Sequence, residues 1–182
     1  MFNELPFKDD LMEFSMWATY AIEEKNNERL FNHVMSSLNE DTYQKIIDFK
    51  KNHPDEIAAN PLLSGLLYLY VVGFETKSLQ DIEKAYEKYY ELQSKYSFDD
   101  NIKMYMDAGC SVYQTSKDNS VYLSFPIYLY KSHLMEGGVD ATDTRQGYLF
   151  PTQKLTKEDI ERIQKECPEA VSKITKKHSE SR

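Results

Sequence analysis

The residues with the chemistry for covalent catalysis are two cysteines, and neither has the expected surroundings. An enzyme of this kind needs a nucleophile, a base and an orienting group, or else a set of metal ligands. Cys110 lies in the segment MDAGCSVY, on the apolar face of a predicted helix, which is typical of a buried structural thiol. Cys167 precedes Pro168 and has no base near it in the sequence. The cysteines therefore do not indicate a nucleophile.

Polar side chains that could bind a ligand gather between His133 and Arg145. His133 and Glu136 have the three-residue spacing that places two side chains on one helical face, but no second pair of metal ligands accompanies them. Asp140 and Asp143 lie next to Arg145, without the alternating oxygen ligands and closing glutamate of a calcium loop. Two alternatives stay open: a site for an ion or small molecule, and local hydrogen bonding within a loop.

Other chemical motifs are missing from the sequence. It contains no phosphate-binding P-loop, no dinucleotide fingerprint and no G-x-S-x-G nucleophile turn. Two cysteines without a C-x-x-C spacing exclude a disulfide framework and a zinc knuckle, and they suit a reducing compartment. We therefore expect no cofactor and no metal, and we expect a binding protein more than an enzyme.

The charge of the chain limits its partners. The 182 residues carry a net charge of -8, which disfavours direct binding to nucleic acid or to an anionic membrane. The acidity is concentrated in the first two thirds, where it could attract a basic protein, including one with a nucleic-acid channel. A solvated surface is the simpler explanation. The first residues, MFNELPFKDD, do not resemble a secretory signal, so a cytoplasmic location is expected.

The apolar stretch from Asn60 to Phe74, NPLLSGLLYLYVVGF, must be covered by the rest of the chain. Its length and the capping pair Asn60 and Pro61 predict a helix, although its β-branched and aromatic residues would also suit a buried strand. It is shorter than the roughly 20 residues of a membrane span. Gly65 and Gly73 weaken a helix, which indicates that a neighbouring helix approaches closely there.

Apolar residues at three- and four-residue spacing predict further helices around this core. Asn39 or Ser37, Ser78 and Thr156 are the expected N-caps of three of them, and Pro168 is expected to break the last one. The predicted helices cover about residues 9–25, 30–38, 43–53, 79–96, 102–113 and 157–174.

Two segments are harder to assign. Residues 121–130 alternate like a half-buried strand, in which Pro126 would require an edge position, but they also fit a helix kinked at Pro126. Residues 137–155 contain half of the six glycines and are predicted to be a long loop. The expected fold is mainly α, a single-domain helical bundle or stacked helical hairpins with a possible short β segment. Residues 1–155 would form the core domain, and 156–182 a C-terminal helical segment with a frayed tail.

Part of the chain resembles the tetratricopeptide repeat family. Small and aromatic residues recur in two sets, and the glycines that begin the sets, Gly73 and Gly109, lie 36 residues apart, close to that family's period of about 34. The sets are Gly73, Ala85 and Tyr89, then Gly109, Val121 and Phe125. The resemblance covers about Leu69 to His133, lacks the terminal proline of the motif at Ser97, and implies stacked hairpins that bind a peptide or a protein without catalysis.

Nine of the 14 tyrosines lie between Tyr86 and Tyr130, which is too many for one core face. Most of them would line the core with solvated hydroxyls, but some must be exposed, and exposed tyrosine is a common anchor at protein interfaces. We therefore expect a protein-binding adaptor or inhibitor that uses a tyrosine-rich acidic helical surface. The alternative is a small-molecule-binding protein or small enzyme with its site under residues 137–151, using His133, Asp140, Asp143 and Arg145. The residues of the expected protein-binding surface are Tyr86, Glu87, Tyr90, Glu91, Asp99 and Asp100.

Overall fold

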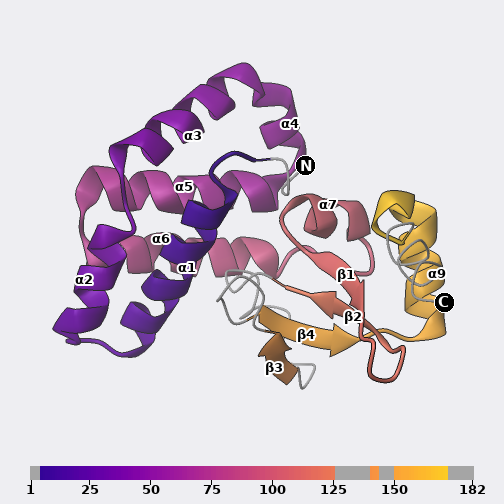
Figure 1. The fold of residues 1–182 in the computed structure, drawn as a ribbon. Helices are drawn as coiled ribbons and strands as arrows, with labels where there is room; N and C mark the ends of the chain where they lie inside the picture. Colours follow the sequence, from indigo (N-terminus) through magenta and orange to yellow (C-terminus); the bar gives the residue numbers. More distant parts are fainter. Residues whose placement is uncertain (1–4, 126–139, 144–149, 172–182) are drawn as a thin grey trace.

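The computed structural model describes residues 5–125, 140–143 and 150–171. A group of helices occupies one end of the molecule, and a small sheet with two further helices occupies the other (Figure 1). The predicted mainly α fold with a short β segment is confirmed. The helices are α1 Lys8–Glu23, α2 Glu28–Ser36, α3 Glu40–Asn52, α4 Pro54–Ala59, α5 Pro61–Thr76, α6 Leu79–Gln93, α7 Ile102–Asp107 and α9 Lys157–Glu166. The strands are β1 Ser111–Gln114, β2 Val121–Ser124, β3 Asp140–Asp143 and β4 Phe150–Lys154.

Helix α5 is the central helix, as predicted for the apolar stretch. The side chain of Asn60 caps it by accepting a hydrogen bond from the backbone N–H of Leu63 at 3.1 Å, and Pro61 begins the helix. The Asn60 amide also donates to the carbonyl of Met104 at 3.1 Å, which ties α5 to α7. In Figure 1, α5 runs between α3 and α6. Most of its side chains are therefore buried, and the residues with no or almost no exposure are Leu62, Leu63, Leu66, Leu67, Leu69 and Tyr70.

The helices before α5 follow the predicted order, with one addition. Asn39, rather than Ser37, caps α3 by accepting from the backbone N–H of Thr42 at 2.7 Å. Pro54 ends α3 as expected but also begins the short helix α4, which the sequence analysis did not predict. A proline can do both because it is disfavoured inside a helix and well suited to the first helical position.

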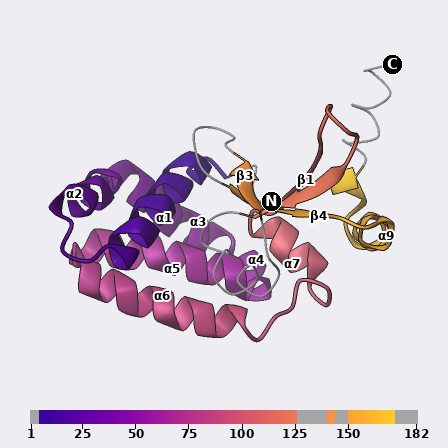
Figure 2. The same cartoon turned by 90° about the horizontal axis from the view of Figure 1, so that it is seen from below.

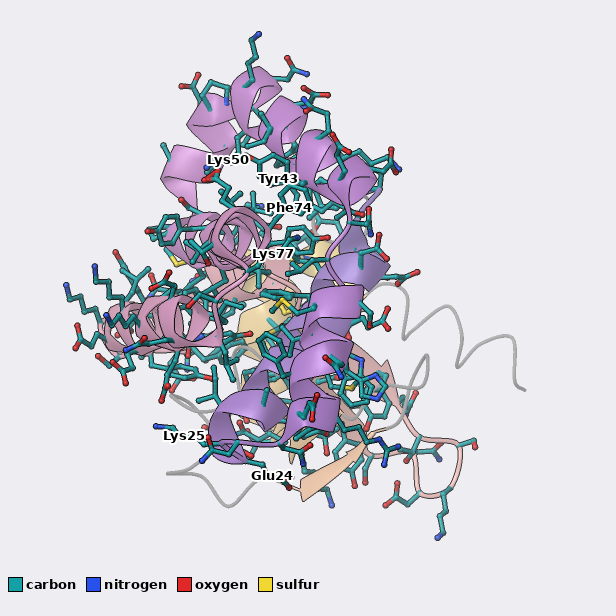
Figure 3. The ribbon with its side chains drawn as sticks, turned by 90° about the vertical axis from the view of Figure 1, so that its left-hand side faces the viewer. Glu24, Lys25, Tyr43, Lys50, Phe74 and Lys77 are labelled. Carbon is teal, nitrogen blue, oxygen red and sulfur yellow. The ribbon has the colours of Figure 1, made fainter. Side chains whose placement is uncertain are left out.

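Helices α5 and α6 form an antiparallel hairpin with the most extensive contact of any helix pair (Figure 2). The turn contains Lys77 in the left-handed conformation, with φ 50°, and Ser78 caps α6 as predicted. An aromatic stack covers this turn (Figure 3): the rings of Tyr43 and Phe74 lie 4.3 Å apart, and the Lys77 ammonium lies 3.9 Å from the Phe74 ring centre. This stack holds α3 against the end of α5.

The helix predicted over residues 102–113 is wrong in its second half. Helix α7 ends at Asp107, Gly109 has φ 123°, and β1 follows. Strand β1 pairs antiparallel with β2, with Val112 opposite Leu123 and Tyr113 opposite Tyr122. The pleat places the two tyrosine rings on one face, where they stack 5.7 Å apart. The open choice for residues 121–130 is therefore settled as strand over Val121–Ser124, and Pro126 lies outside the described residues.

The long loop predicted over residues 137–155 is also corrected, because it contains β3 and β4. The described strands form an antiparallel sheet in the order β1-β2-β4-β3. After β4, Thr156 and Asp159 form the expected capping box of α9, and the helix is interrupted at Cys167 before residues 168–171 resume it. In the repeat-like region, the first set of residues lies in the α5–α6 hairpin, whereas Gly109 follows α7 and Val121 lies in β2.

Candidate functional site

Of the two tyrosines expected at the protein-binding surface, Tyr86 is buried and Tyr90 is partly buried. Tyr86 is only 1% exposed, and its hydroxyl donates to the carbonyl of Ser15 at 3.3 Å. Tyr90 is partly buried and packs against Tyr86, with ring centres 5.6 Å apart. Burial raises the pKa of both hydroxyls. Tyr86 is a core residue because its position on α6 faces α1, so it cannot serve as an exposed anchor.

The acidic residues of that surface are exposed but dispersed. Glu87 and Glu91 lie on the solvent side of α6. Asp99 pairs with Arg162 of α9 at 3.1 Å, and the Arg162 guanidinium also donates to the Asp99 carbonyl. Asp100 accepts a hydrogen bond from the Ser97 hydroxyl at 3.0 Å. Two of the four carboxylates therefore have contacts within the chain that organise the α6–α7 connection.

The alternative site falls largely outside the described residues. His133 and Arg145 are not among them, and Asp140 and Asp143 are described as positions on β3, opposite Thr152 and Phe150 of β4. In the described parts of the chain, no group of three or more His, Cys, Asp or Glu side chains is placed to hold a metal ion.

The two thiols have the surroundings of structural cysteines. Cys110 is 3% exposed, and desolvation by burial raises its pKa well above the ordinary value. Cys167 is also buried, and its thiol donates to the Glu169 carboxylate at 3.2 Å. Burial and this acidic neighbour raise its pKa as well. Both effects disfavour the thiolate, which is the nucleophilic form.

A different surface, which we call the Tyr68 groove, is a hollow beside an exposed aromatic residue. It lies along α5, between the last turns of α3 and the middle of α6, and its volume is about 340 Å³. Tyr68 is 51% exposed, although it belongs to the most deeply buried helix of the core. The residues that line the groove are Lys50, Pro61, Ser64, Gly65, Tyr68, Ala85, Lys88, Tyr89 and Leu92.

The floor of the groove exists because Gly65 has no side chain. A β-carbon at that position would lie 2.5 Å from Cδ2 and 2.7 Å from Cε2 of Tyr89, so the ring packs directly on the α5 backbone. The Tyr89 hydroxyl fixes the ring by donating to the Leu62 carbonyl at 3.0 Å. The close approach predicted at Gly65 is therefore present, with an aromatic ring as the group that fills it.

The rim of the groove carries hydrogen-bond donors and positive charge. Lys50 enters from α3 and Lys88 from α6, and Figure 3 labels Lys50 on α3 above the end-on view of α5. Within the described residues, neither lysine forms an ion pair with a carboxylate, and the hydroxyls of Ser64 and Tyr68 have no hydrogen-bond partner. None of the lining residues is acidic.

Two features of the chain hide this site from prediction by sequence. Lys50 is remote in sequence from the α5–α6 hairpin, and only the packing of α3 on α5 brings it to the groove. Tyr68 was part of an uninterrupted apolar run without a polar stripe, so periodicity did not indicate which of its residues would face solvent. The available signal was Gly65 followed by a tyrosine one helical turn later.

Comparison with protein families, with curated proteins and with solved structures gives no match to this chain. Each helix within the described ranges is too short or too polar to cross a membrane.

Proposed function

We propose that this chain is a non-enzymatic protein-binding protein, an adaptor or an inhibitor, and that it contacts its partner through the Tyr68 groove. The observation that carries the proposal is the half-exposed Tyr68 ring beside a preformed hollow, on the helix that forms the core. Tyrosine combines a large apolar surface with few rotatable bonds and a polar tip, and such residues dominate the energetics of many interfaces.

The floor of the groove is rigidly packed, which favours a site whose structure changes little when a partner binds. Its floor is made of Gly65 and the buried ring of Tyr89, both held inside the α5–α6 hairpin. A rigid site avoids much of the cost of ordering loops and side chains during association. Tyr68 would then act as an anchor on a surface that is already formed.

The exposed glutamates of α6 would form a secondary contact with the same partner. Glu87 and Glu91 are exposed on the helix that also provides one wall of the groove. These carboxylates would lie at the margin of the interface, where charge affects association rates more than affinity. This acidic surface offers no exposed tyrosine at position 86 as an anchor, because Tyr86 is buried.

Affinity capture from a lysate of the source cells, followed by binding measurements with each captured protein, tests this proposal. We expect Tyr68→Ala to weaken binding of the specific partner by at least about tenfold, equivalent to about 1.4 kcal/mol. Tyr68→Phe should retain most of the affinity because it keeps the ring. Glu87→Ala/Glu91→Ala tests the acidic surface of α6 separately, and it should change the association rate more than the affinity. A partner that is lost with the glutamate pair and retained with Tyr68→Ala would contradict the groove as the binding site.

A further inference from the structure

The Tyr68 groove has the opposite charge from the chain as a whole. The protein carries a net charge of -8, yet the only charged residues that line this groove are Lys50 and Lys88. Two other hollows on the described surface have mixed charge. One, at the start of α1 and the end of α3, contains Lys45, Asp48 and Glu56, and the other, on α2, contains Glu28 and Arg29. The charge at the groove is therefore a local property and not a consequence of composition.

The two lysines come from helices on opposite sides of α5. Helix α3 packs on one side of α5 and α6 on the other (Figure 1). Lys50 comes from α3 and Lys88 from α6, and Ser64 and Tyr68 of α5 line the groove with them. Every polar side chain that lines the groove is a donor or a hydroxyl. Their natural complements are carboxylate oxygens, since unpaired lysine ammonium groups form charge-assisted hydrogen bonds with them.

The apolar part of the groove indicates that the occupant also carries an apolar group. Gly65, Ala85, Tyr89 and Leu92 form an apolar surface next to the Tyr68 ring. A volume of about 340 Å³ lies at the low end of the range of about 300 to 1,000 Å³ that is usual for ligand pockets. The groove is open to solvent, so an apolar side chain of a partner can enter it while the groups around that side chain reach the rim.

We infer that the partner occupies the Tyr68 groove with an acidic segment, in which an apolar side chain contacts Tyr68 and flanking carboxylates pair with Lys50 and Lys88. This inference rests on the proposed function and names the chemistry of the partner at that site. It replaces, at this surface, the basic partner expected from the overall charge, because a basic segment would bring like charges together at both lysines. A nucleic acid would meet the same two lysines, but the net charge of -8 would repel a continuous row of phosphates more than a segment with a few carboxylates.

Selection from a random peptide display library against the full chain tests the inference. The variants are wild type, Tyr68→Ala, the reversal Lys50→Glu/Lys88→Glu and the milder Lys50→Gln/Lys88→Gln. The matched control is Lys51→Glu/Lys84→Glu, which makes the same charge change at exposed lysines that do not line the groove. Circular dichroism confirms that each variant is folded. The enriched peptides are then synthesised, and their affinities are measured at low and high salt.

We expect the enriched peptides to carry one aromatic or aliphatic residue flanked by Asp and Glu. Their affinity should fall at least about tenfold with Tyr68→Ala and with the reversal, less with the glutamine pair, and about twofold or less with the control. It should also weaken as salt increases.

Neutral or basic peptides that lose binding with Tyr68→Ala but not with the reversal would overturn the inference and leave the proposed function intact. If no enriched peptide is sensitive to Tyr68→Ala, both are overturned. Displacement of the acidic peptides by an oligonucleotide at equal ionic strength, with the oligonucleotide bound more tightly, would also overturn the acidic protein segment as the occupant.

Discussion

The ring of Tyr89 occupies the place where a side chain on Gly65 would begin. A β-carbon on Gly65 would lie 2.5 Å from the ring, closer than real side chains approach, while the Tyr89 hydroxyl bonds to Leu62 one turn earlier on the same helix. This contact packs α6 directly on the α5 backbone and also forms the floor of the Tyr68 groove. Core packing and the candidate site therefore depend on the same pair of residues.

Replacing Gly65 with alanine should destabilise the protein, although alanine is the better helix former by about 1 kcal/mol. The new methyl group would force the buried Tyr89 ring to shift, and overpacking of this kind costs about 1 to 3 kcal/mol. We expect a net loss of about 1 kcal/mol in the free energy of unfolding, measured by urea denaturation. Ser64→Ala, at the neighbouring position of α5, is the control and should be neutral or slightly stabilising. A Gly65→Ala variant as stable as that control would show that the ring is free to move.

Replacing Asn60 with alanine should remove two hydrogen bonds at once. The side chain caps α5 through the Leu63 N–H and donates its amide to the Met104 carbonyl. Loss of a cap costs about 0.5 to 2 kcal/mol, and loss of a further bond that a buried side chain makes adds about 1 kcal/mol. Asn60→Ser keeps a capping oxygen but has no amide to reach Met104, so its loss should be smaller by about 1 kcal/mol. Equal losses in the two variants, measured by thermal and urea unfolding, would mean that the cap contributes little.

Alkaline pH should unfold the protein through its buried tyrosines. Burial raises the pKa of Tyr86 and Tyr89 above the ordinary value, and that of Tyr105 to about 12. Because an unfolded chain releases these protons near about pH 10, the folded state binds more protons above that pH, and the free energy of unfolding falls as pH rises. The stabilisation should be complete below about pH 10 and should be lost as pH rises from there towards 12.

Urea unfolding across this range, with tyrosinate absorbance recorded in parallel, measures the effect. Tyr105→Phe removes a hydroxyl that donates to the Tyr96 carbonyl at 2.6 Å, so this variant should be less stable near neutral pH but less sensitive to alkali. A free energy of unfolding that stays constant from about pH 9 to about pH 11.5 would contradict the buried state of these hydroxyls.

The N-cap residues were sufficient to predict where three of the helices begin. Asn60, Ser78 and Thr156 cap the helices for which they were predicted, because a cap involves only residues three positions away. The errors occurred where local patterns were compatible with two structures. Val112 and Tyr113 continue a helical spacing, but they pair with Leu123 and Tyr122 across a hairpin, and this pairing depends on contacts that are not local.

The candidate site also depends partly on local signals in the sequence and partly on contacts that are not local. The sequence by itself determined that the stretch around Gly65 is buried, and it favoured a helix that a neighbouring helix approaches closely at that glycine, because of its hydrophobicity, its cap and the cost of glycine in a helix. Only the tertiary structure decided that Tyr86 is buried while Tyr68 is exposed, and that Lys50 and Lys88 line the same groove. Which residue of an apolar helix faces solvent depends on how completely its neighbours cover it, and that coverage is a property of the packed helices rather than of any one segment.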